Sequence, residues 1–442
     1  MKKYMKIHES PFNIIRTVMS LINDKFIDHG IRVAYICHMM SKYEGRVDGH
    51  ELRMMTSSAL FHDIGAYKTE EVEDLMHFEV ANSLPHAVYG YLFTKYLSPL
   101  DSQAEVILYH HMPYSDSLKH TSPYMKQALR MHLADRIDIS ALFDGDNRAV
   151  IDAVAKYSGS LFSPYEVELF INADKKYNII NALRDDTCET YMRDYYNGLA
   201  LKEEELIKLI KMLVFTIDFR SEQTIVHTIQ VAAFAKLLGE YFNMSEEEQE
   251  DLYFAGLLHD FGKIKVPVSI LEKDGPLDND EWPVMKRHAQ WTREIVGGFA
   301  NDDITEIAAR HHEKLNGSGY PGKLLADDLT LSQRIMAVAD IASALSGKRS
   351  YKDPMPKETV LGILEKMGGN GQLDSDIIKV LEANYDAFMS KSAHDSQDAA
   401  SRYEALKSEY AALISKYTSL DDKFYATNEQ LFADLAASSC CA

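Results

Sequence analysis

The sequence is poor in features that would each indicate a particular class of protein. Its 442 residues include only four cysteines, so a disulfide-stapled scaffold is excluded. No run approaches 18 uncharged apolar residues, and no membrane span is therefore expected. The first residues, MKKYMKIHESPFN, lack the apolar segment of a secretory signal. Together these absences favour a protein of the reducing cytoplasm.

Basic residues are also scarce relative to acidic ones. Lys and Arg number 47 against 67 Asp and Glu, which leaves a formal net charge of −20. Such a chain should not bind duplex DNA non-specifically, because that binding needs a basic surface. A small anionic substrate remains compatible where metals or clustered cations override the global charge.

The remaining composition is that of an ordinary globular protein, and the length predicts two or three domains. Strand signals are few. Apolar residues recur at helical spacing over 201–217 and 225–242, and Ser245 followed by Glu248 is a helix start signal. The expected fold class is therefore all-α.

The 17 histidines carry the most information, because they fall into two clusters with none between His132 and His227. Similar text flanks both clusters: ALFHDIG matches GLLHDFG, and ILYHHMP matches AARHHEK. The period is near 197 residues, which predicts an internal duplication. The first cluster comprises His29, His62, Asp63, His86, His110, His111 and Asp135, and the second comprises His227, His259, Asp260, His288, His311, His312 and Asp340.

The duplication sets the predicted organisation of the chain. A first copy is expected over 1–145, a helical connector over 146–200, a second copy over 201–385 and a C-terminal helix over 386–442. This last helix carries a heptad-like seam. The seam favours either a helix packed on its own domain or a coiled coil that forms a homodimer, and it consists of Tyr403, Leu406, Tyr410, Leu413, Tyr417, Leu420 and Phe424.

Histidine and aspartate on successive helices suit a site for Fe, Mn or Zn. Neighbouring helical residues differ by about 100° in direction, so His259 and Asp260 are expected at a helix end, and Gly262 supports that placement. Asp260 could then bridge two metals, and the doublet of His311 and His312 could serve the second. The number of ligands favours two metals.

Each element of this pattern also has an ordinary explanation. A lone histidine is usually a hydrogen-bonded core or surface residue. The chain contains a third His-Asp dipeptide, His394 and Asp395, which lies in a polar stretch and is assigned to the surface. It is the repetition of the whole pattern, in the same order, that favours a metal site.

The second cluster resembles a known family. LLHDFGKIKVP (257–267) followed by HHEKLNGSGYP (311–321) resembles the HD-GYP family, a branch of the HD metal-dependent phosphohydrolases, over about 215–355. The first cluster resembles a plain HD domain. The resemblance implies tandem all-helical domains, a di- or tri-metal centre, and hydrolysis of cyclic dinucleotides, c-di-GMP or 3'3'-cGAMP, in bacterial second-messenger signalling.

The resemblance also implies roles for particular residues. The seven members of the second cluster would be the metal ligands, with Asp260 and Lys263 catalytic. Substrate contacts would come from Lys263, Gly319, Tyr320, Pro321, Arg349 and Lys352. Tyr320 could stack on a base or pack inward.

Three positions depart from the family pattern. Trinuclear members carry Glu where Gln223 stands, so two metals are predicted, with Fe or Mn favoured. Asn316 and Ser343 stand where the family often has Asp, and both are candidates for base recognition.

The first copy keeps all seven ligand types but differs elsewhere. Ala66 stands where Lys263 would align, and HHMPYSDSLKH replaces the GYP loop. The sequence leaves open whether this copy binds metal, binds a regulator or only braces the second copy.

The predicted function is metal-dependent hydrolysis of a 3',5'-cyclic dinucleotide to a linear dinucleotide, by attack of a metal-activated hydroxide. Two alternatives remain: an HD phosphohydrolase acting on mononucleotides, and a signalling module that binds cyclic nucleotide through structural metals. The sequence does not choose between c-di-GMP and 3'3'-cGAMP, and it does not identify the native metal.

Overall fold

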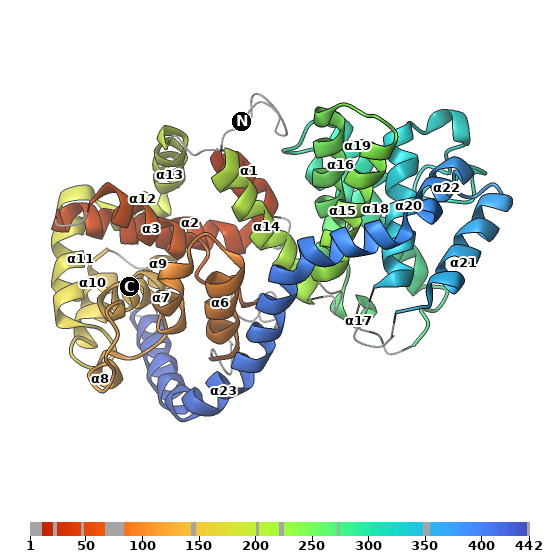
Figure 1. Cartoon of the computed structure of the whole chain (residues 1–442). Helices are drawn as coiled ribbons and strands as arrows, with labels where there is room; N and C mark the ends of the chain where they lie inside the picture. The colour runs from red at the N-terminus through yellow and green to blue at the C-terminus, as the bar shows by residue number, and fades with distance from the viewer. Residues whose placement is uncertain are drawn as a thin grey trace. The chain divides into compact units, whose positions relative to one another are not determined.

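The computed structural model is helical throughout its described part, which confirms the all-α prediction (Figure 1). Only isolated bridges, between Ser158 and Phe162 and between Asn316 and Leu325, interrupt the helices and loops there. None of the helices in this part is both long enough and apolar enough to cross a bilayer. The structure describes residues 11–20, 24–45, 48–66, 84–142, 147–199, 203–220, 225–271, 273, 275–347 and 354–439.

The chain divides into two compact units. The N-terminal unit contains residues of 11–201 together with those from 405 onward, and the C-terminal unit contains residues of 202–404. The two histidine clusters therefore lie in different units. The predicted connector, 146–200, groups with the N-terminal unit, and the first part of the predicted C-terminal helix groups with the C-terminal unit.

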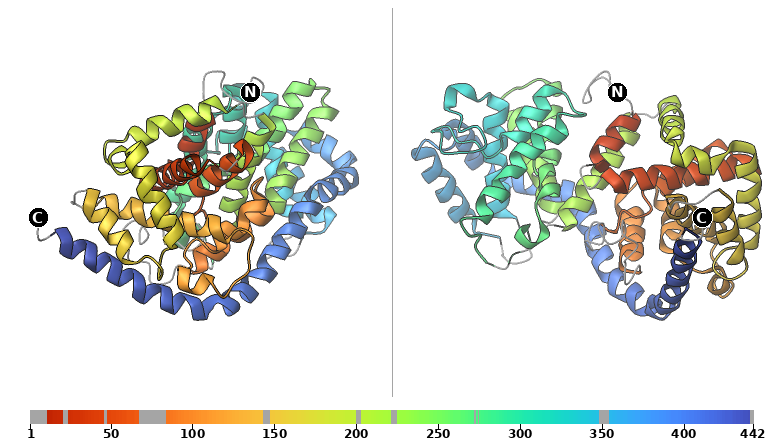
Figure 2. Two further views of the ribbon diagram at one scale, coloured as in Figure 1. Left: turned by 90° about the vertical axis from the view of Figure 1, so that its left-hand side faces the viewer. Right: turned by 180° about the vertical axis from the view of Figure 1, so that it is seen from behind.

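The N-terminal unit consists of α-helices and one short 3-10 helix over its described residues. Its elements are α1 (Pro11–Ser20), α2 (Asp24–Glu44), α3 (Gly49–Leu60), α6 (Leu84–Leu97), η1 (Asp101–Gln103), α7 (Ala104–Leu108), α8 (Tyr114–Ser117), α9 (Met125–Leu142), α10 (Asn147–Lys156), α11 (Pro164–Tyr177), α12 (Ile179–Arg184) and α13 (Thr187–Gly198). Helix α2 packs against α1, α3, α9, α11 and α13 and lies at the centre of the unit (Figure 2).

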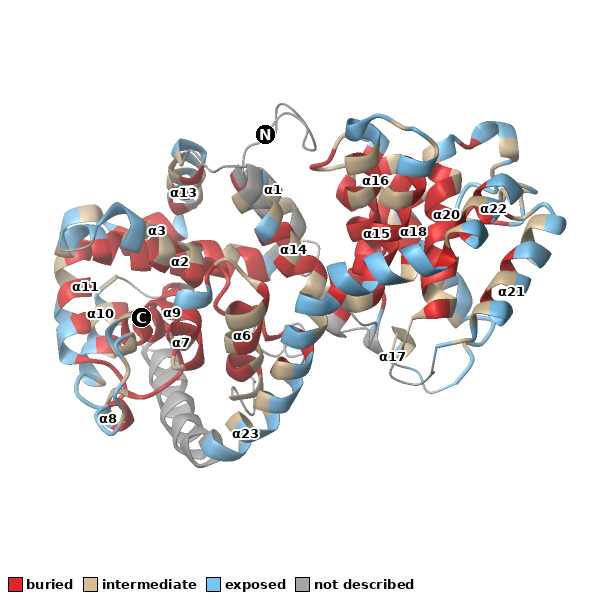
Figure 3. Cartoon of the chain, in the orientation of Figure 1, coloured by how far each residue is buried: buried red, intermediate tan, exposed pale blue. Residues whose placement is uncertain are grey.

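The C-terminal unit follows the same order of helices. Its elements are α14 (Glu203–Arg220), α15 (Ile225–Tyr241), α16 (Glu246–Leu258), η2 (Phe261–Lys265), α17 (Val268–Leu271), α18 (Glu281–Val296), α19 (Asp302–Ala309), η3 (Ala326–Asp328), α20 (Leu331–Ser346), α21 (Lys357–Gly369), α22 (Ser375–Ala383) and the first part of α23 (Tyr385–Ser439). Helices α15, α16 and α20 form its buried centre (Figure 3).

Local signals place the ends of these helices. Ser245 accepts a hydrogen bond from the Glu248 amide while Glu248 accepts one from the Ser245 amide, so the predicted capping box is confirmed. Thr330 and Gln333 form the same motif at the start of α20. Each such cap satisfies amide groups that would otherwise lack an intrahelical partner.

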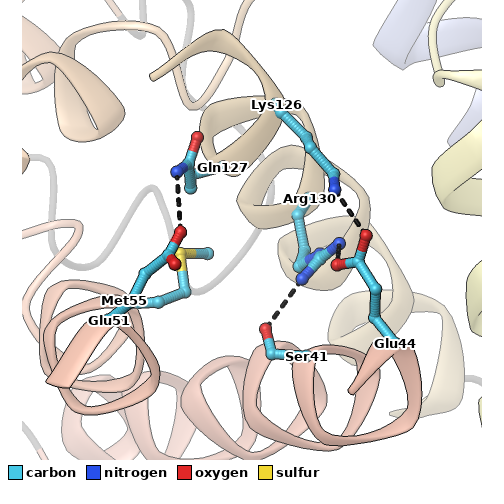
Figure 4. A pocket seen from close by; sticks show the side chains of 7 residues that line it. All are labelled: Ser41, Glu44, Glu51, Met55, Lys126, Gln127 and Arg130. Carbon is cyan, nitrogen blue, oxygen red and sulfur yellow. Dashed lines mark hydrogen bonds and ion pairs between the residues drawn. The ribbon is translucent and has the colours of Figure 1, made fainter. Parts of the chain in front are cut away.

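The segment 146–200 is tied to the first copy by a buried charge network. Arg130 of α9 donates to Glu166 of α11 at 2.8 Å, and also to Glu44 and Ser41 of α2. Arg130, Glu44 and Ser41 also line a small polar pocket, in which Arg130 and Lys126 both pair with Glu44 (Figure 4). A buried ion pair is costly to break, which explains why the segment packs as part of this unit rather than as a separate connector.

The first residues of the heptad-like seam on α23 pack against other residues of the same chain. Tyr403 and Leu406 are buried, and Tyr410 stacks on Tyr89 with ring centroids 4.2 Å apart. Glu409 accepts hydrogen bonds from Lys95 and Tyr96. Tyr417, Leu420 and Phe424 lie outside the residues whose side chains are described. A homodimer through this helix stays a prediction.

Candidate metal centre

The seven residues of the second cluster come from five elements of the C-terminal unit. Each lies on a helix that faces the interior or at the end of one: His227 on α15, His259 and Asp260 directly after α16, His288 on α18, His311 and His312 after α19, and Asp340 on α20. His259 caps the C-terminus of α16. The predicted helix end at this dipeptide is confirmed.

Gly262 is needed here because its turn packs closely against another part of the backbone. A Cβ at Gly262 would lie 2.0 Å from the backbone oxygen of His288. Gly65 meets the backbone oxygen of His86 at the same distance in the N-terminal unit. In both copies the turn after the His-Asp dipeptide packs against the backbone of the next ligand-bearing helix, which leaves room only for glycine.

Three histidines of the cluster have the same fixed tautomer. The Nδ1 atoms of His259, His288 and His311 each donate to the carbonyl oxygen three residues earlier, at 2.8, 2.7 and 2.7 Å. A carbonyl oxygen only accepts, so in the neutral form of each ring the proton sits on Nδ1 and Nε2 carries a lone pair. Metal-ligating histidines are commonly oriented in this way.

These lone pairs converge on Asp260. Its Oδ2 lies 3.1 Å from His259 Nε2, and its Oδ1 lies 3.5 Å from His288 Nε2. His288 Nε2 and His311 Nε2 are 3.3 Å apart with no ring proton between them. Within the described residues, His259 Nε2 and Asp260 Oδ1 are buried and make no hydrogen bond. The donor set fits divalent cations, because they would satisfy these atoms.

Asp340 completes the cluster from the opposite side. Its Oδ1 lies 3.5 Å from His227 Nε2, and its Oδ2 lies 3.7 Å from His312 Nδ1. The ligand atoms form two groups, each within 4.8 Å: one has His227, His259 and Asp260, the other has His288, His311 and His312. Asp260 presents one oxygen to each group, as a bridging carboxylate would.

The protonation states also suit metal binding. Burial lowers the pKa of His288 to about 4 and that of His311 to about 3, so both rings are neutral near pH 7. Burial opposes charge on Asp260, but Lys263 and His259 outweigh it and hold the pKa of Asp260 well below its usual range. Neutral imidazoles beside an ionised carboxylate are the ligating forms, and His288 and His311 have this form. At His259 burial opposes charge, but Asp260 outweighs it and raises the pKa to about 9, so a bound cation would displace that proton.

Lys263 and the loop after His312 line the same centre. Lys263 Nζ lies 2.7 Å from Asp260 Oδ2, and the residue is only 8% exposed. The loop is held by Glu313, whose carboxylate accepts from the amides of Gly322 and Leu324. Gly317 has a φ of +75°, which favours glycine there.

Tyr320 packs inward. Its ring centroid lies 4.7 Å from that of His312, so the ring covers a ligand of the centre. Gly319 lets the loop approach this closely, because a Cβ there would lie 2.6 Å from the Cα of Glu313. Pro321 follows Tyr320 through a cis peptide bond.

Comparison with known proteins identifies the type of domain that contains this centre. A family model described as HD domain matches residues 207–377, and a second model with the same description matches residues 26–140. The chain belongs to the HD-domain family. Its two units are accordingly an N-terminal and a C-terminal HD domain, and HD domains depend on metal.

Individual relatives are named phosphodiesterases. The 3'3'-cGAMP-specific phosphodiesterase 1 of Vibrio cholerae is 29% identical over 418 residues, 89% of this chain and 95% of the relative. The 3'3'-cGAMP-specific phosphodiesterase 2 of the same organism is 37% identical over 41% of this chain and 35% of its own length. The cyclic di-GMP phosphodiesterase response regulator RpfG of Xanthomonas campestris is 38% identical over 38% of this chain and 45% of its own length. The chain thus spans nearly the whole of the first relative and less than half of the other two.

Ser343 does not face a substrate base in the C-terminal HD domain, so its candidacy for base recognition was wrong. The residue is fully buried, and its Oγ lies 3.0 Å from His227 Nδ1. In the N-terminal HD domain Asp138 takes this place, with Oδ2 2.7 Å from His29 Nδ1. Both side chains orient the first histidine of their cluster.

Replacing Ser343 by alanine is expected to weaken metal binding roughly 10- to 100-fold, because His227 would lose the partner that orients its ring. Competition with a chelator measures this. Ser346→Ala is the matched control, since Ser346 is buried on the same helix and donates to the backbone oxygen of Ala342. Equal metal affinity in the two variants would show that Ser343 does not orient His227.

Several predicted positions cannot be placed at the site. Arg349, Lys352 and Gln223 lie outside the described residues. Asn316 is exposed, and its Oδ1 accepts from the amide and the hydroxyl of Ser318.

Two charged residues that the sequence did not predict as part of the site interact electrostatically with the centre. The ammonium of Lys314 is buried, makes no hydrogen bond among the described residues, and interacts electrostatically with Asp340. Asp218 of α14 is buried beside Thr228, and burial raises its pKa to about 7. Lys314 could have been found by its place two residues after His312, but nothing in the sequence marks Asp218.

Proposed function

We propose that the C-terminal HD domain hydrolyses a 3',5'-cyclic dinucleotide, c-di-GMP or 3'3'-cGAMP, to a linear dinucleotide. The observation that carries the proposal is the convergence of three oriented Nε2 lone pairs on the two oxygens of Asp260. The names of the relatives support the substrate class, because they describe enzymes that act on these dinucleotides.

Two divalent cations fit this ligand set, with Fe or Mn favoured by the mixed imidazole and carboxylate donors. His227, His259 and Asp340 would hold one, His288, His311 and His312 would hold the other, and Asp260 would join them. Bound there, the pair would supply a water of lowered pKa and neutralise charge on the phosphate oxygens.

Lys263 is the group best placed to assist the leaving oxygen. Its ammonium lies 2.7 Å from Asp260 Oδ2, at the carboxylate shared by the two subsites. From this position it can donate a charge-assisted hydrogen bond to the phosphate or a proton to the departing alkoxide. Tyr320 would border the substrate on the side of His312.

Lys314 supplies a second cation for the anionic substrate. Burial lowers the pKa of its ammonium, and a phosphate oxygen would provide the missing hydrogen-bond partner. Lys314→Met is expected to raise KM about 10- to 100-fold, the size of a hydrogen bond to a charged group, with a smaller change in kcat. Steady-state kinetics measure both, and the exposed Lys323 of the same loop provides the control Lys323→Met. An unchanged KM would remove Lys314 from the substrate site.

Product analysis tests the function itself. The full chain, reconstituted separately with Fe and with Mn, is incubated with c-di-GMP, 3'3'-cGAMP and mononucleotides side by side, and the products are separated. A linear dinucleotide from either substrate is expected, and His259→Ala should abolish it. Tight binding without turnover would favour a signalling module that binds cyclic nucleotide. Turnover of mononucleotides alone would favour an HD phosphohydrolase that acts on mononucleotides.

A further inference from the structure

The N-terminal HD domain holds a cation of its own among its candidate ligands. Arg136 is 7% exposed, and its Nη2 lies 3.1 Å from His111 Nδ1 and 3.5 Å from Asp135 Oδ2. The C-terminal HD domain has the uncharged Ile341 directly after Asp340, where Arg136 follows Asp135. We propose that Arg136 replaces one of the two metals, so that the N-terminal HD domain holds a single divalent cation.

The hydrogen bond of Arg136 fixes the proton on His111. A guanidinium only donates, so His111 Nδ1 must accept and the ring proton sits on Nε2. His111 Nε2 lies 2.7 Å from His86 Nε2, a distance at which it donates to that nitrogen. The lone pair of His86 Nε2 accepts this hydrogen bond, so neither His86 Nε2 nor His111 Nε2 is available to bind a metal.

The corresponding residues of the C-terminal HD domain are His288 and His312, whose ring centroids lie 5.0 Å apart. His288 and His311 both direct lone pairs inward there, and His312 Nδ1 faces Asp340 Oδ2 at 3.7 Å, as His111 Nδ1 faces Asp135 Oδ2 at 3.7 Å in the N-terminal HD domain. No side-chain cation follows the aspartate, since residue 341 is isoleucine. The second subsite therefore keeps its donors in this domain.

The candidate ligands of the second subsite of the N-terminal HD domain are Asp63, His86, His110 and His111. With His86 and His111 paired to each other, two protein donors remain among the described residues. These are Asp63 Oδ1 and His110 Nε2, which lie 3.3 Å apart. Two donors are fewer than the three that a catalytic or structural metal usually takes from protein.

The first subsite, by contrast, is complete. His62 Nδ1 donates to the Ala59 backbone oxygen at 2.8 Å, and the buried His62 Nε2 makes no hydrogen bond in the described part of the chain. His29 Nε2 lies 3.3 Å from Asp135 Oδ1. Asp138 accepts from His29 Nδ1, which turns Nε2 inward as in a carboxylate–histidine–metal arrangement.

A single cation changes what this domain can do. Two metals can stabilise both the attacking and the leaving oxygen of an in-line displacement. This domain lacks the second metal, and Ala66 stands where the C-terminal HD domain has Lys263. It therefore binds a metal without hydrolysing a phosphodiester.

Metal analysis of the full chain tests the proposal. Protein is loaded with Mn, freed of excess metal by gel filtration, and counted by mass spectrometry. Three ions per chain are expected for the unaltered chain, four for Arg136→Ile and two for His62→Ala. Arg136→Gln removes the charge with less change in polarity and should also give four ions. This second variant keeps the test valid if the isoleucine variant misfolds. Circular dichroism and hydrolysis at the C-terminal HD domain report that each variant is folded.

Three results would overturn the proposal. These are four ions in the unaltered chain, no loss of metal in His62→Ala, and a count that stays at three in both folded Arg136 variants. The counts are differences between variants, so they do not depend on whether the C-terminal HD domain hydrolyses a dinucleotide. Absence of hydrolysis with an unchanged metal pattern would contradict the proposed function alone.

Discussion

Asp260→Ala is expected to reduce the hydrolysis of a cyclic dinucleotide at least about 10³-fold. The side chain presents one oxygen to each of the two ligand groups, so its loss removes a donor from both subsites at once. Metal ions contribute several kcal/mol of transition-state stabilisation, and each 1.36 kcal/mol corresponds to a factor of ten in rate. Initial rates of dinucleotide formation, with metal counted on the same samples, measure the effect.

The chain offers a matched control for this substitution. Asp395 follows His394 in the same dipeptide, but both residues are exposed on α23, as the sequence predicted. Asp395→Ala should leave both the rate and the metal count unchanged. Activity of Asp260→Ala close to that of Asp395→Ala would place the reaction away from this centre.

Lys263→Met is expected to lower kcat about 10²- to 10⁴-fold, the range for removal of a general acid. In contrast to Asp260→Ala, the metal content should be retained, because an ammonium group is not a metal ligand. The methionine side chain also fills a similar volume in this buried position. Steady-state kinetics with metal analysis separate the two variants.

Lys265→Met is the control for this lysine. Lys265 lies on the same short helix η2, but it is exposed, and its Nζ stands 3.9 Å from the nearest carboxylate oxygen of Glu294. Its replacement should change neither kcat nor KM appreciably. A normal kcat in Lys263→Met would exclude the lysine from the chemical step and leave the metals to stabilise the leaving group.

Local sequence features predicted a large part of the fold and of the centre. The duplicated order of His and Asp indicated two similar helical domains, and the structure brings the seven residues of each copy together. The capping box at Ser245 and the helix end at His259 were also predictable, because each depends on residues within one turn of helix.

Other features were beyond prediction because they join distant parts of the chain. Ser343 lies 116 residues from His227 in the sequence, and its hydroxyl contacts the ring of this candidate metal ligand rather than a substrate. Asp218 lies beside the centre only because α14 packs against η2. The place of the segment 146–200 follows from the buried pair of Arg130 and Glu166, which no local pattern marks.

The sequence alone determined which atoms were available: imidazoles and carboxylates in a repeated order, a lysine in one copy and none at that position in the other. Only the tertiary structure decided how each is directed. The carbonyl oxygens that accept from His259 and His311 set which nitrogen faces the centre, and the guanidinium beside His111 sets how its proton is used. The physical reason is that a side chain's tautomer and charge depend on neighbours in space, which residue order does not specify.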